Sequence, residues 1–438
     1  MLLGENVMKK IAFVALTLLF TPFVVAGFSL SDIPWSIGDQ FGTTRVNNTG
    51  LTVFPTLVIP MGGEYEAMGT AYTAVARDAT FFDANPAASS RLQYTELSLM
   101  HNNLIADTNM ESAVYTLRYG DLGLAAGGKF LHVPFTEYDI VGAQQNAVRY
   151  TEVVAGANVS YNFFNSFNFH GVAAGTTLKV AHRNIPAVIA PGQSAFGIMA
   201  DFGLLSRFNL LKFYPSRDKN FSVGLTARNI GPPVLDEPLP SSIVGGIAYA
   251  PLNPLLLAFD LSVPIMPFSD VPAEPLGYAG GVAVQVTDFF GAQTGFLLRG
   301  GNPRLSLGGS LDLSDLRFQV NYTLDMTTQT DRIDRFSVMA SLNLGDRGRA
   351  DLQRRVEEHY LDSLVAYAAG EFEATVALAE RALELNPRFE PAAETRDTAL
   401  RLLSLQQRLE AIRLGEEDND LPIDPAETDA VPEQPSSP

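Results

Sequence analysis

The feature that most constrains this chain is an alternation of apolar and polar residues with period two, which runs from about residue 93 to residue 345. In "RFSVMASLNL", Phe336, Val338 and Leu342 share one face of an extended strand, and Ser337 and Ser341 share the other. The stretches "LRFQVNYTLDM" and "FSVGLTARNI" repeat the pattern. One face of each strand therefore suits an apolar environment, and the other tolerates water.

Alternation of this kind is found in soluble β-sandwiches and in membrane barrels, so the lengths of the connections have to decide. Tight turns such as Gly120-Asp121 and Ser314-Asp315 mostly alternate with longer stretches such as "GPPVLDEPLPSSI". Short turns at one rim and long loops at the other are typical of outer-membrane barrels. We predict an all-β transmembrane barrel of about 14 antiparallel strands over residues 93–345, whose even strand number returns both ends to the periplasm. The soluble sandwich is the alternative.

The N-terminal stretch "MKKIAFVALTLLFTPFVVAGF" has the pattern of a signal peptide. Lys9 and Lys10 precede a short apolar core, and Val24 and Ala26 occupy the small-residue positions of a cleavage site. A retained transmembrane helix would need about 20 apolar residues, and Pro22 interrupts this run. Residues 1–26 are therefore predicted to be removed on export.

Composition and motifs exclude several classes of function. The chain has no cysteine, which excludes disulfides, thiolate metal sites and cysteine catalysis. Its net charge of -18 disfavours nucleic acid as a partner, although much of this charge lies in residues 415–438, an acidic tail predicted to be disordered. The five histidines form no H-E-x-x-H motif and no G-x-S-x-G motif is present. We expect no enzyme activity, metal or cofactor; a hydrolase with a Ser-His pair across neighbouring strands is the remaining enzymatic alternative.

The stretch "MGTAYTAVARDATFFDANPA", Met68 to Ala87, precedes the first predicted strand and consists mostly of small residues. Small side chains allow a segment to approach the inner wall of a barrel closely, and Asn85-Pro86 would release the chain toward the first strand. Phe81 and Phe82 either line an apolar pocket or only pack the segment against the wall. Residues 27–92 are therefore predicted to form a plug and the lead-in to the barrel.

This stretch resembles the segment before the first strand of the FadL-type long-chain fatty-acid transporters and the related PorV-like proteins. The matching positions are Gly69, Ala74, Ala76, Asp78, Ala79, Thr80, Phe81, Phe82, Asn85, Pro86 and Ala87. Further stretches, among them "KFLHVPFTEYD" and "LPSSIVGGIAYAP", look like an uncharacterised spirochaetal branch of that group. The resemblance covers about residues 60 to 345. It implies an outer-membrane barrel with a plug on the periplasmic side of its lumen, through which long-chain fatty acids or similar hydrophobic molecules diffuse passively.

The resemblance also suggests ligand-binding residues. The plug would include the apolar, Pro-interrupted stretch "TGLTVFPTLVIPMGGEYEAMG". Candidates for ligand contact or plug function are Val53, Phe54, Leu57, Ile59, Met68, Gly69, Phe81, Phe82, Asn85 and Pro86. Each apolar one could instead simply bury against the wall. Four basic residues face inward by strand parity and could bind a carboxylate: Arg118, Lys129, Arg228 and Arg299.

After Leu344 the period changes, and residues 350–414 are predicted to be helical. Within them "AAGEFEATVALAERALELNP" resembles a tetratricopeptide repeat, with Gly370, Phe372, Ala382 and Pro387 at that repeat's spacing. Such a module would bind a protein partner in the periplasm, whereas a plain helical hairpin would not. Two functions stay open: a FadL-like transporter, or a PorV-like barrel that anchors the helical module to dock envelope or secretion machinery.

Overall fold

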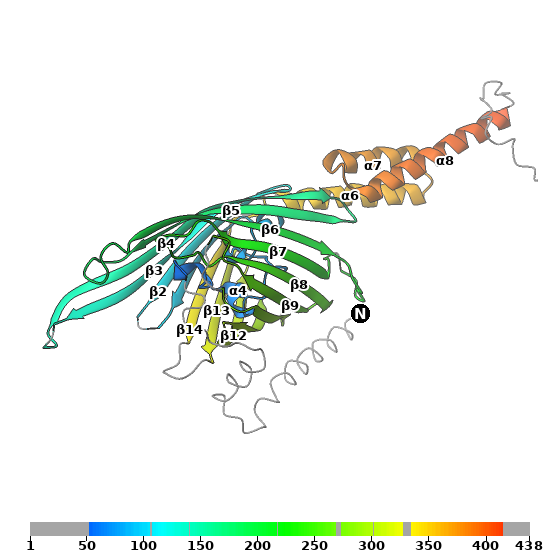
Figure 1. The fold of residues 1–438 in the computed structure, drawn as a ribbon. Helices are drawn as coiled ribbons and strands as arrows, with labels where there is room; N and C mark the ends of the chain where they lie inside the picture. The colour runs from blue at the N-terminus through cyan, green and yellow to red at the C-terminus, as the bar shows by residue number, and fades with distance from the viewer. Residues whose placement is uncertain are drawn as a thin grey trace, which may run out of the picture. The chain divides into compact units, whose positions relative to one another are not determined.

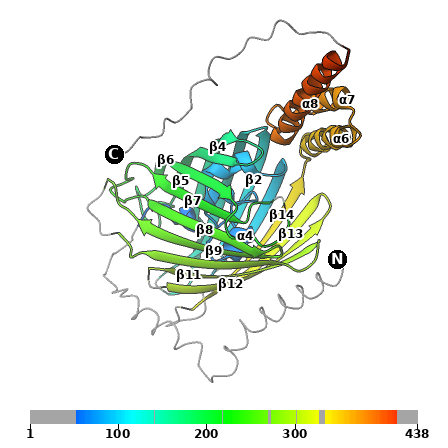
Figure 2. The same cartoon turned by 90° about the vertical axis from the view of Figure 1, so that its right-hand side faces the viewer.

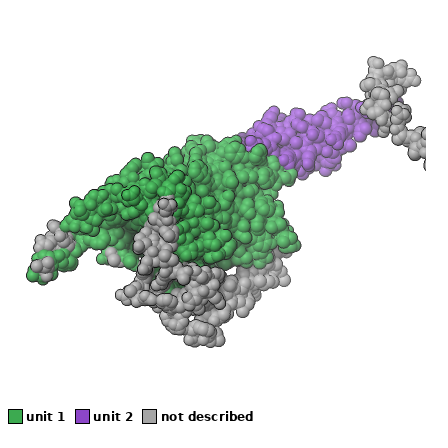
Figure 3. Space-filling model, viewed as in Figure 1, with its two compact units in different colours: residues 1–348 green, residues 349–438 purple. Residues whose placement is uncertain are grey.

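The structure is a computed structural model that describes residues 52–414, apart from 106, 140, 217, 269–272, 301 and 327–333. The predicted signal peptide, the plug residues before 52 and the acidic tail lie outside the described residues. The chain divides into two compact units, residues up to 348 and residues from 349 onward, which Figure 3 shows in different colours.

The first unit is a closed antiparallel barrel of fourteen strands, in which β1 pairs with β14 and every other strand pairs with its neighbours in sequence (Figures 1 and 2). The strands are β1 (Glu96–Asn103), β2 (Asn109–Tyr119), β3 (Leu122–Tyr138), β4 (Gln144–Asn165), β5 (His170–Asn184), β6 (Ala195–Phe208), β7 (Phe221–Ile230), β8 (Ser242–Leu252), β9 (Leu255–Pro264), β10 (Gly277–Gln285), β11 (Phe290–Arg299), β12 (Asn302–Leu313), β13 (Leu316–Asp325) and β14 (Arg335–Asn343). The predicted fold class and strand number are confirmed.

The period-two pattern separates an apolar exterior from a polar interior. On β13, Val320 and Tyr322 are 46% and 42% exposed, whereas Asn321 between them is 2% exposed. Apolar side chains also point outward from the other strands, such as Leu225 on β7 and Phe259 on β9. A closed barrel has no unpaired sheet edge around its circumference, and an apolar outer face matches lipid. This arrangement is that of a membrane barrel and excludes the sandwich.

No helix in the described part of the chain combines the length and the apolar character that crossing a membrane requires.

The connections differ between the two rims. We call the rim that carries the β5–β6, β7–β8 and β9–β10 connections the long-loop rim, and the one that carries β2–β3, β8–β9 and β12–β13 the short-turn rim. The β6–β7 connection, residues 209–220, is a long one at the short-turn rim. The chain enters the barrel at the short-turn rim, where β1 begins, and leaves it at the same rim after β14.

The segment before β1 lies inside the barrel. It contains η1 (Pro55–Leu57), α4 (Gly63–Ala67), α5 (Phe81–Ala84) and η2 (Pro86–Arg91). At the long-loop rim, Val53 N donates to Pro238 O in the β7–β8 connection at 3.0 Å. Near the short-turn rim, Arg118 Nη1 donates to Leu92 O at 2.9 Å. The described plug, residues 52–92, therefore runs through the lumen from one rim to the other.

Glycines in the barrel wall let the plug backbone approach it. A Cβ added to Gly295 would lie 2.0 Å from the carbonyl carbon of Met68 and 2.1 Å from Gly69 N. A Cβ on Gly123 would lie 2.1 Å from the carbonyl carbon of Ser89. These distances are far below van der Waals contact, so only glycine fits at these wall positions. The sequence predicted small residues on the plug side; the structure shows that the wall supplies them as well.

The second unit consists of α6 (Arg349–Ala368), α7 (Phe372–Leu385) and α8 (Glu390–Leu414), so the predicted C-terminal helices are present. Its core is small: Val356, Ala379, Ala382, Phe389 and Ala392 are all buried.

We predict that Gly295→Ala loosens the plug, because the added methyl group overlaps the plug backbone and overpacking of this kind costs about 1–3 kcal/mol. Gly280→Ala is the matched control, since a Cβ at Gly280 on the neighbouring strand meets nothing within 4 Å. The temperature at which the folded band converts to the unfolded band on gels should fall for Gly295→Ala only. Equal temperatures for both variants would show that the plug does not press on this part of the wall.

Candidate functional site

A cavity of about 80 Å³ lies in the lumen toward the long-loop rim, between the plug and the wall. The plug lines it with Leu57, Ile59 and Tyr65, and the wall contributes apolar Val244 and Leu297. The same cavity carries basic and acidic side chains, namely Lys179, Arg228, Arg299, Arg304, Asp83 and Asp260. The cavity thus joins apolar surface to guanidinium groups. Its volume holds a small cluster of waters and is too small for a long hydrocarbon chain.

Two of the four predicted carboxylate anchors line this cavity. The Arg299 side chain is 33% exposed, and its Nε donates to Glu274 Oε2 at 2.9 Å. Arg228 is committed to the plug, because its Nη2 donates to Thr73 Oγ1 at 2.7 Å and also to Ala84 O. Of these two residues, Arg228 therefore bonds to the plug, whereas Arg299 bonds to Glu274 in the β9–β10 connection.

The other two predicted anchors lie away from the cavity lining and hold the plug. Lys129 Nζ lies 2.6 Å from Asp83 Oδ2 and donates to Ile59 O at 2.7 Å. Its side chain is 3% exposed. Arg118 lies near the short-turn rim, where it donates to Gly120 O and Leu92 O. The alternation along each strand predicted that all four side chains point inward. It could not predict which part of the plug each side chain contacts.

The first part of the plug is fixed by acidic side chains. Asp83 Oδ2 accepts a hydrogen bond from Met61 N at 3.1 Å in addition to its ion pair with Lys129. Glu152 Oε1 on β4 accepts one from Thr56 N at 3.0 Å. Asp83, Lys129 and Glu152 therefore hold residues 56–61 in place through hydrogen bonds to their backbone. These residues include Leu57 and Ile59, which line the cavity.

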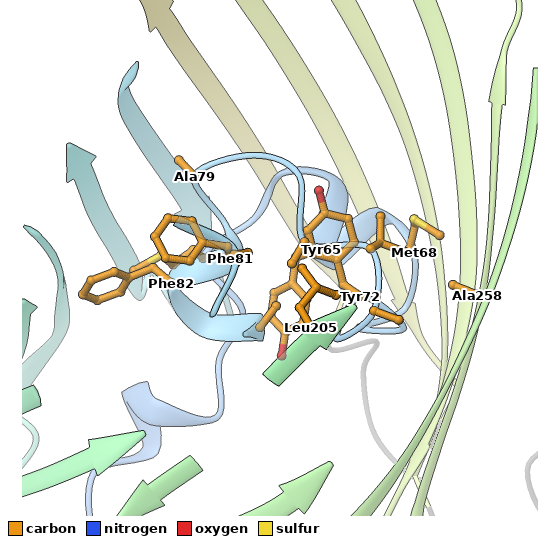
Figure 4. Packing of buried hydrophobic residues seen from close by; sticks show 14 of the residues in the cluster. Tyr65, Met68, Tyr72, Ala79, Phe81, Phe82, Leu205 and Ala258 are labelled. Atoms are coloured by element: carbon orange, nitrogen blue, oxygen red, sulfur yellow. The ribbon is translucent and has the colours of Figure 1, made fainter. Parts of the chain in front are cut away.

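The predicted apolar ligand residues separate into different environments. Leu57 and Ile59 line the cavity, and Leu57 also packs against a buried cluster that contains Val53 and Phe54 together with Val154, Ala181, Ala195, Met199 and Leu239. Phe81 and Phe82 are 0% and 1% exposed and pack inside the core that the plug forms with the wall (Figure 4). Neither phenylalanine lines the lumen cavity. Met68 and Gly69 lie against Gly295, as described above.

Asn85 and Pro86 join the plug to the wall. Asn85 Nδ2 donates to Thr73 O at 2.8 Å and to Leu204 O at 3.0 Å, and its Oδ1 accepts from Ala87 N. Pro86 O accepts a hydrogen bond from Asn158 Nδ2 at 3.0 Å. The Asn-Pro step is thus a fixed joint between the plug and the barrel.

Several residues of this site were not predicted. Lys179, Arg304 and Asp260 face inward by the same parity that selected the four anchors, and Asp83 stands in the quoted plug stretch. Asp260 Oδ2 accepts hydrogen bonds from Tyr72 N at 3.1 Å and Thr73 N at 2.9 Å. An anionic ligand calls for cations, so the expected ligand gave no reason to select acidic side chains. In the described residues no group of three or more His, Asp or Glu side chains could hold a metal ion.

Four residues of the helical unit were noted in the sequence because they lie at the spacing of a tetratricopeptide repeat. Gly370 has φ 81 at the turn after α6, and the Phe372 ring packs on Tyr367 at 6.0 Å between centroids. Ala382 is fully buried, and Pro387 follows the end of α7. The positive φ of Gly370 and the full burial of Ala382 explain why a glycine and a small side chain occupy these two positions.

Among solved structures, the chain is similar to the toluene transporter TodX of Pseudomonas putida. The two share 12% identity with a TM-score of 0.44, over 68% of this chain and 98% of TodX. Similarity to the toluene transporter TbuX of Ralstonia pickettii is at 11% identity and a TM-score of 0.44, over 68% of this chain and 99% of TbuX.

Among sequences, a UPF0164 protein of Treponema pallidum (strain Nichols) is 28% identical over 416 residues, which are 91% of this chain and 94% of that protein. A second UPF0164 protein of the same organism is 26% identical over 378 residues, covering 81% of this chain and 76% of that protein. The model of the uncharacterised protein family UPF0164 matches residues 39–346. The chain therefore belongs to the UPF0164 family.

Proposed function

We propose that this protein is an outer-membrane transporter that admits hydrophobic molecules with an anionic group, and that long-chain fatty acids are its main class of ligand. The observation that carries the proposal is the lumen cavity, whose lining includes both the apolar plug residues Leu57 and Ile59 and the basic residue Arg299. A ligand site for such a molecule needs a mostly apolar surface and a few well-placed polar groups. Arg304, whose side chain is 30% exposed and hydrogen-bonded to Asp325 at 3.1 Å, adds another guanidinium to the cavity.

Passage of a long chain requires the first part of the plug to move, because the cavity of about 80 Å³ is too small for it. The residues that must move are 56–61, which hold their place through Asp83, Lys129 and Glu152. Residues 63–91 can stay, since α4 and η2 are fixed against many strands of the wall. Transport in this scheme is passive diffusion, with the membrane gradient of the ligand as its driving force.

The first test compares two arginines at opposite ends of the lumen. Arg299→Gln should weaken binding of hexadecanoate roughly tenfold or more, because a hydrogen bond between charged groups contributes about 1.5–3 kcal/mol. Binding of hexadecanol, which has no charge, should change little. Displacement of a fluorescent fatty acid from the purified protein in detergent measures both affinities. Arg118→Gln is the matched control; equal losses in the two variants, or for the two ligands, would refute the proposed anchor.

A second candidate function is favoured by the helical unit. Leu361 and Val365, one turn apart on α6, are 58% and 70% exposed. Exposed apolar patches of this kind often mark protein-interaction surfaces. In this alternative the barrel anchors a tetratricopeptide-like module that docks envelope or secretion machinery in the periplasm.

We predict a periplasmic position for the helical unit, because the barrel begins and ends at the same rim and α6 follows β14 directly. An epitope inserted after Gly415 should bind antibody only after the outer membrane is permeabilised. Labelling of intact cells would place the unit outside and rule out periplasmic docking. Deletion of residues 350–438 then separates the functions: uptake of fatty acid should survive it if the barrel alone transports.

A further inference from the structure

The last part of α8 has no packing partner within the helical unit. α8 has 25 residues, against 14 in α7, and Figure 1 shows that it extends past the end of α7. Its first half packs within the unit through Ala392 and Ala399, which are both fully buried. Among the described side chains from residue 401 onward, none is buried. Helices in proteins gain most of their stability from packing along one face, so this end of α8 calls for a partner.

An apolar stripe runs along this end of α8. Leu405, Leu409 and Ile412 follow one another at spacings of four and three residues, which is typical of a helix that packs against another helix. They are 52%, 67% and 73% exposed. Arg401 and Arg408 lie along one edge of this row, and neither guanidinium forms an ion pair in the part of the chain that the structure describes. We call these five residues the α8 stripe.

α6 carries an exposed apolar pair with the opposite charge beside it. The pair is Leu361 and Val365, and Glu358 and Asp362 lie along one edge of it. We call these four residues the α6 face. Glu358 forms an exposed ion pair with Arg354 at 2.9 Å, and Asp362 forms no ion pair with any described residue. Exposed pairs within one helix contribute little to stability, so Glu358 can exchange Arg354 for another cation.

The α8 stripe and the α6 face complement each other in chemistry. Packing one on the other would remove both sets of apolar side chains from water and bring two arginines to two carboxylates. Two α8 stripes packed together would instead place four guanidinium groups in one contact, and two α6 faces would place four carboxylates there. Like charges oppose association, whereas opposite charges favour it and fix its register. The charges therefore select the pairing of unlike surfaces.

This pairing requires two chains. Both surfaces are exposed within one helical unit, so the α8 stripe does not cover the α6 face of its own chain. The α6 residues that pack inside the unit, such as Val356 and Ser363, lie on the other side of that helix. Repeated helical units bury their outer faces against neighbouring units. Because one chain carries both members of the complementary pair, a second copy offers each surface the partner that it fits.

We propose that two copies of this protein associate through their helical units, with the α8 stripe of each copy packed on the α6 face of the other. The two contacts are equal and related by a two-fold axis, so the dimer closes without leaving either surface uncovered. The apolar side chains of the stripe would contact Leu361 and Val365, and its two arginines would pair with Glu358 and Asp362. The proposal does not depend on transport, and it names a second copy, in place of another envelope protein, as the partner of α6.

The first test reverses the charges and measures the mass of the full-length protein in detergent by sedimentation. The wild-type protein should sediment as a dimer. Arg401→Glu/Arg408→Glu and Glu358→Arg/Asp362→Arg should each raise the dimer dissociation constant roughly tenfold or more, because like charges then meet in both contacts. A mixture of the two variants should regain the dimer, since every contact between unlike copies again joins opposite charges.

Arg355→Glu/Arg381→Glu is the matched control, because both arginines are exposed on the same unit and belong to neither surface. Its dissociation constant should equal that of the wild type. A second test uses cysteines, of which the chain has none. Copies with Leu409→Cys and copies with Val365→Cys should be joined by a bis-maleimide cross-linker when mixed, and neither variant should be joined to itself. Both replaced side chains are exposed, so each variant should stay folded, which circular dichroism checks.

A wild-type protein that sediments only as a monomer would overturn the proposal. So would a dimer that tolerates both charge reversals, or a mixture of the two variants that stays monomeric. A dimer that persists after deletion of residues 350–438 would place the contact in the barrel, and cross-linking of Leu409→Cys to itself would show that α8 pairs with α8; either result contradicts the unlike pairing. None of these outcomes depends on hexadecanoate affinity or uptake, so the dimer and the transport proposal succeed or fail separately.

Discussion

An irregular segment enclosed in a barrel must find hydrogen-bond partners for its backbone, because little water reaches it. This requirement explains the polar inner face of the wall. Asp260 accepts from Tyr72 N and Thr73 N, Asn102 Nδ2 donates to Pro60 O and Met61 O, and Asn321 Nδ2 donates to Gly63 O. The polar residues that alternate along the strands are therefore buried partners of the plug, and the lumen is a filled interior in place of an open channel.

The plug is held differently along its length. From Gly63 to Arg91 it meets glycine positions such as Gly295 and Gly123, where backbone touches backbone. Before Pro60 it is held by the buried apolar cluster around Val53 and Phe54 and by a few charged groups, above all the buried pair of Lys129 and Asp83. Breaking a buried ion pair by removing one partner is strongly destabilising, but a ligand that brings its own charge can exchange partners with it. The lumen cavity lies beside this first part of the plug, and Leu57, Val58, Ile59 and Pro60 belong to its lining.

The sequence predicted the barrel well because the environment of a barrel strand alternates between lipid on one side and the plug on the other. This alternation is visible in the sequence as Val320, Asn321 and Tyr322. The roles of individual inward residues could not be predicted in this way. Lys129 and Arg299 have the same inward direction, yet one meets Asp83 of the plug and the other a partly open cavity, and that difference depends on where the plug lies. Gly295 and Gly280 likewise look alike in sequence.

Hydrogen–deuterium exchange of the protein in a lipid bilayer tests most directly whether the plug is lodged in the lumen by these contacts. Without ligand, the hydrogen-bonded amides between Met61 and Ala88 should exchange as slowly as those of the barrel strands. Addition of hexadecanoate should speed exchange in residues 56–61 and leave the amides of Tyr72 and Thr73 protected. Rapid exchange throughout residues 56–91 in the absence of ligand would contradict a lodged plug, and with it the closed lumen on which the transport scheme depends.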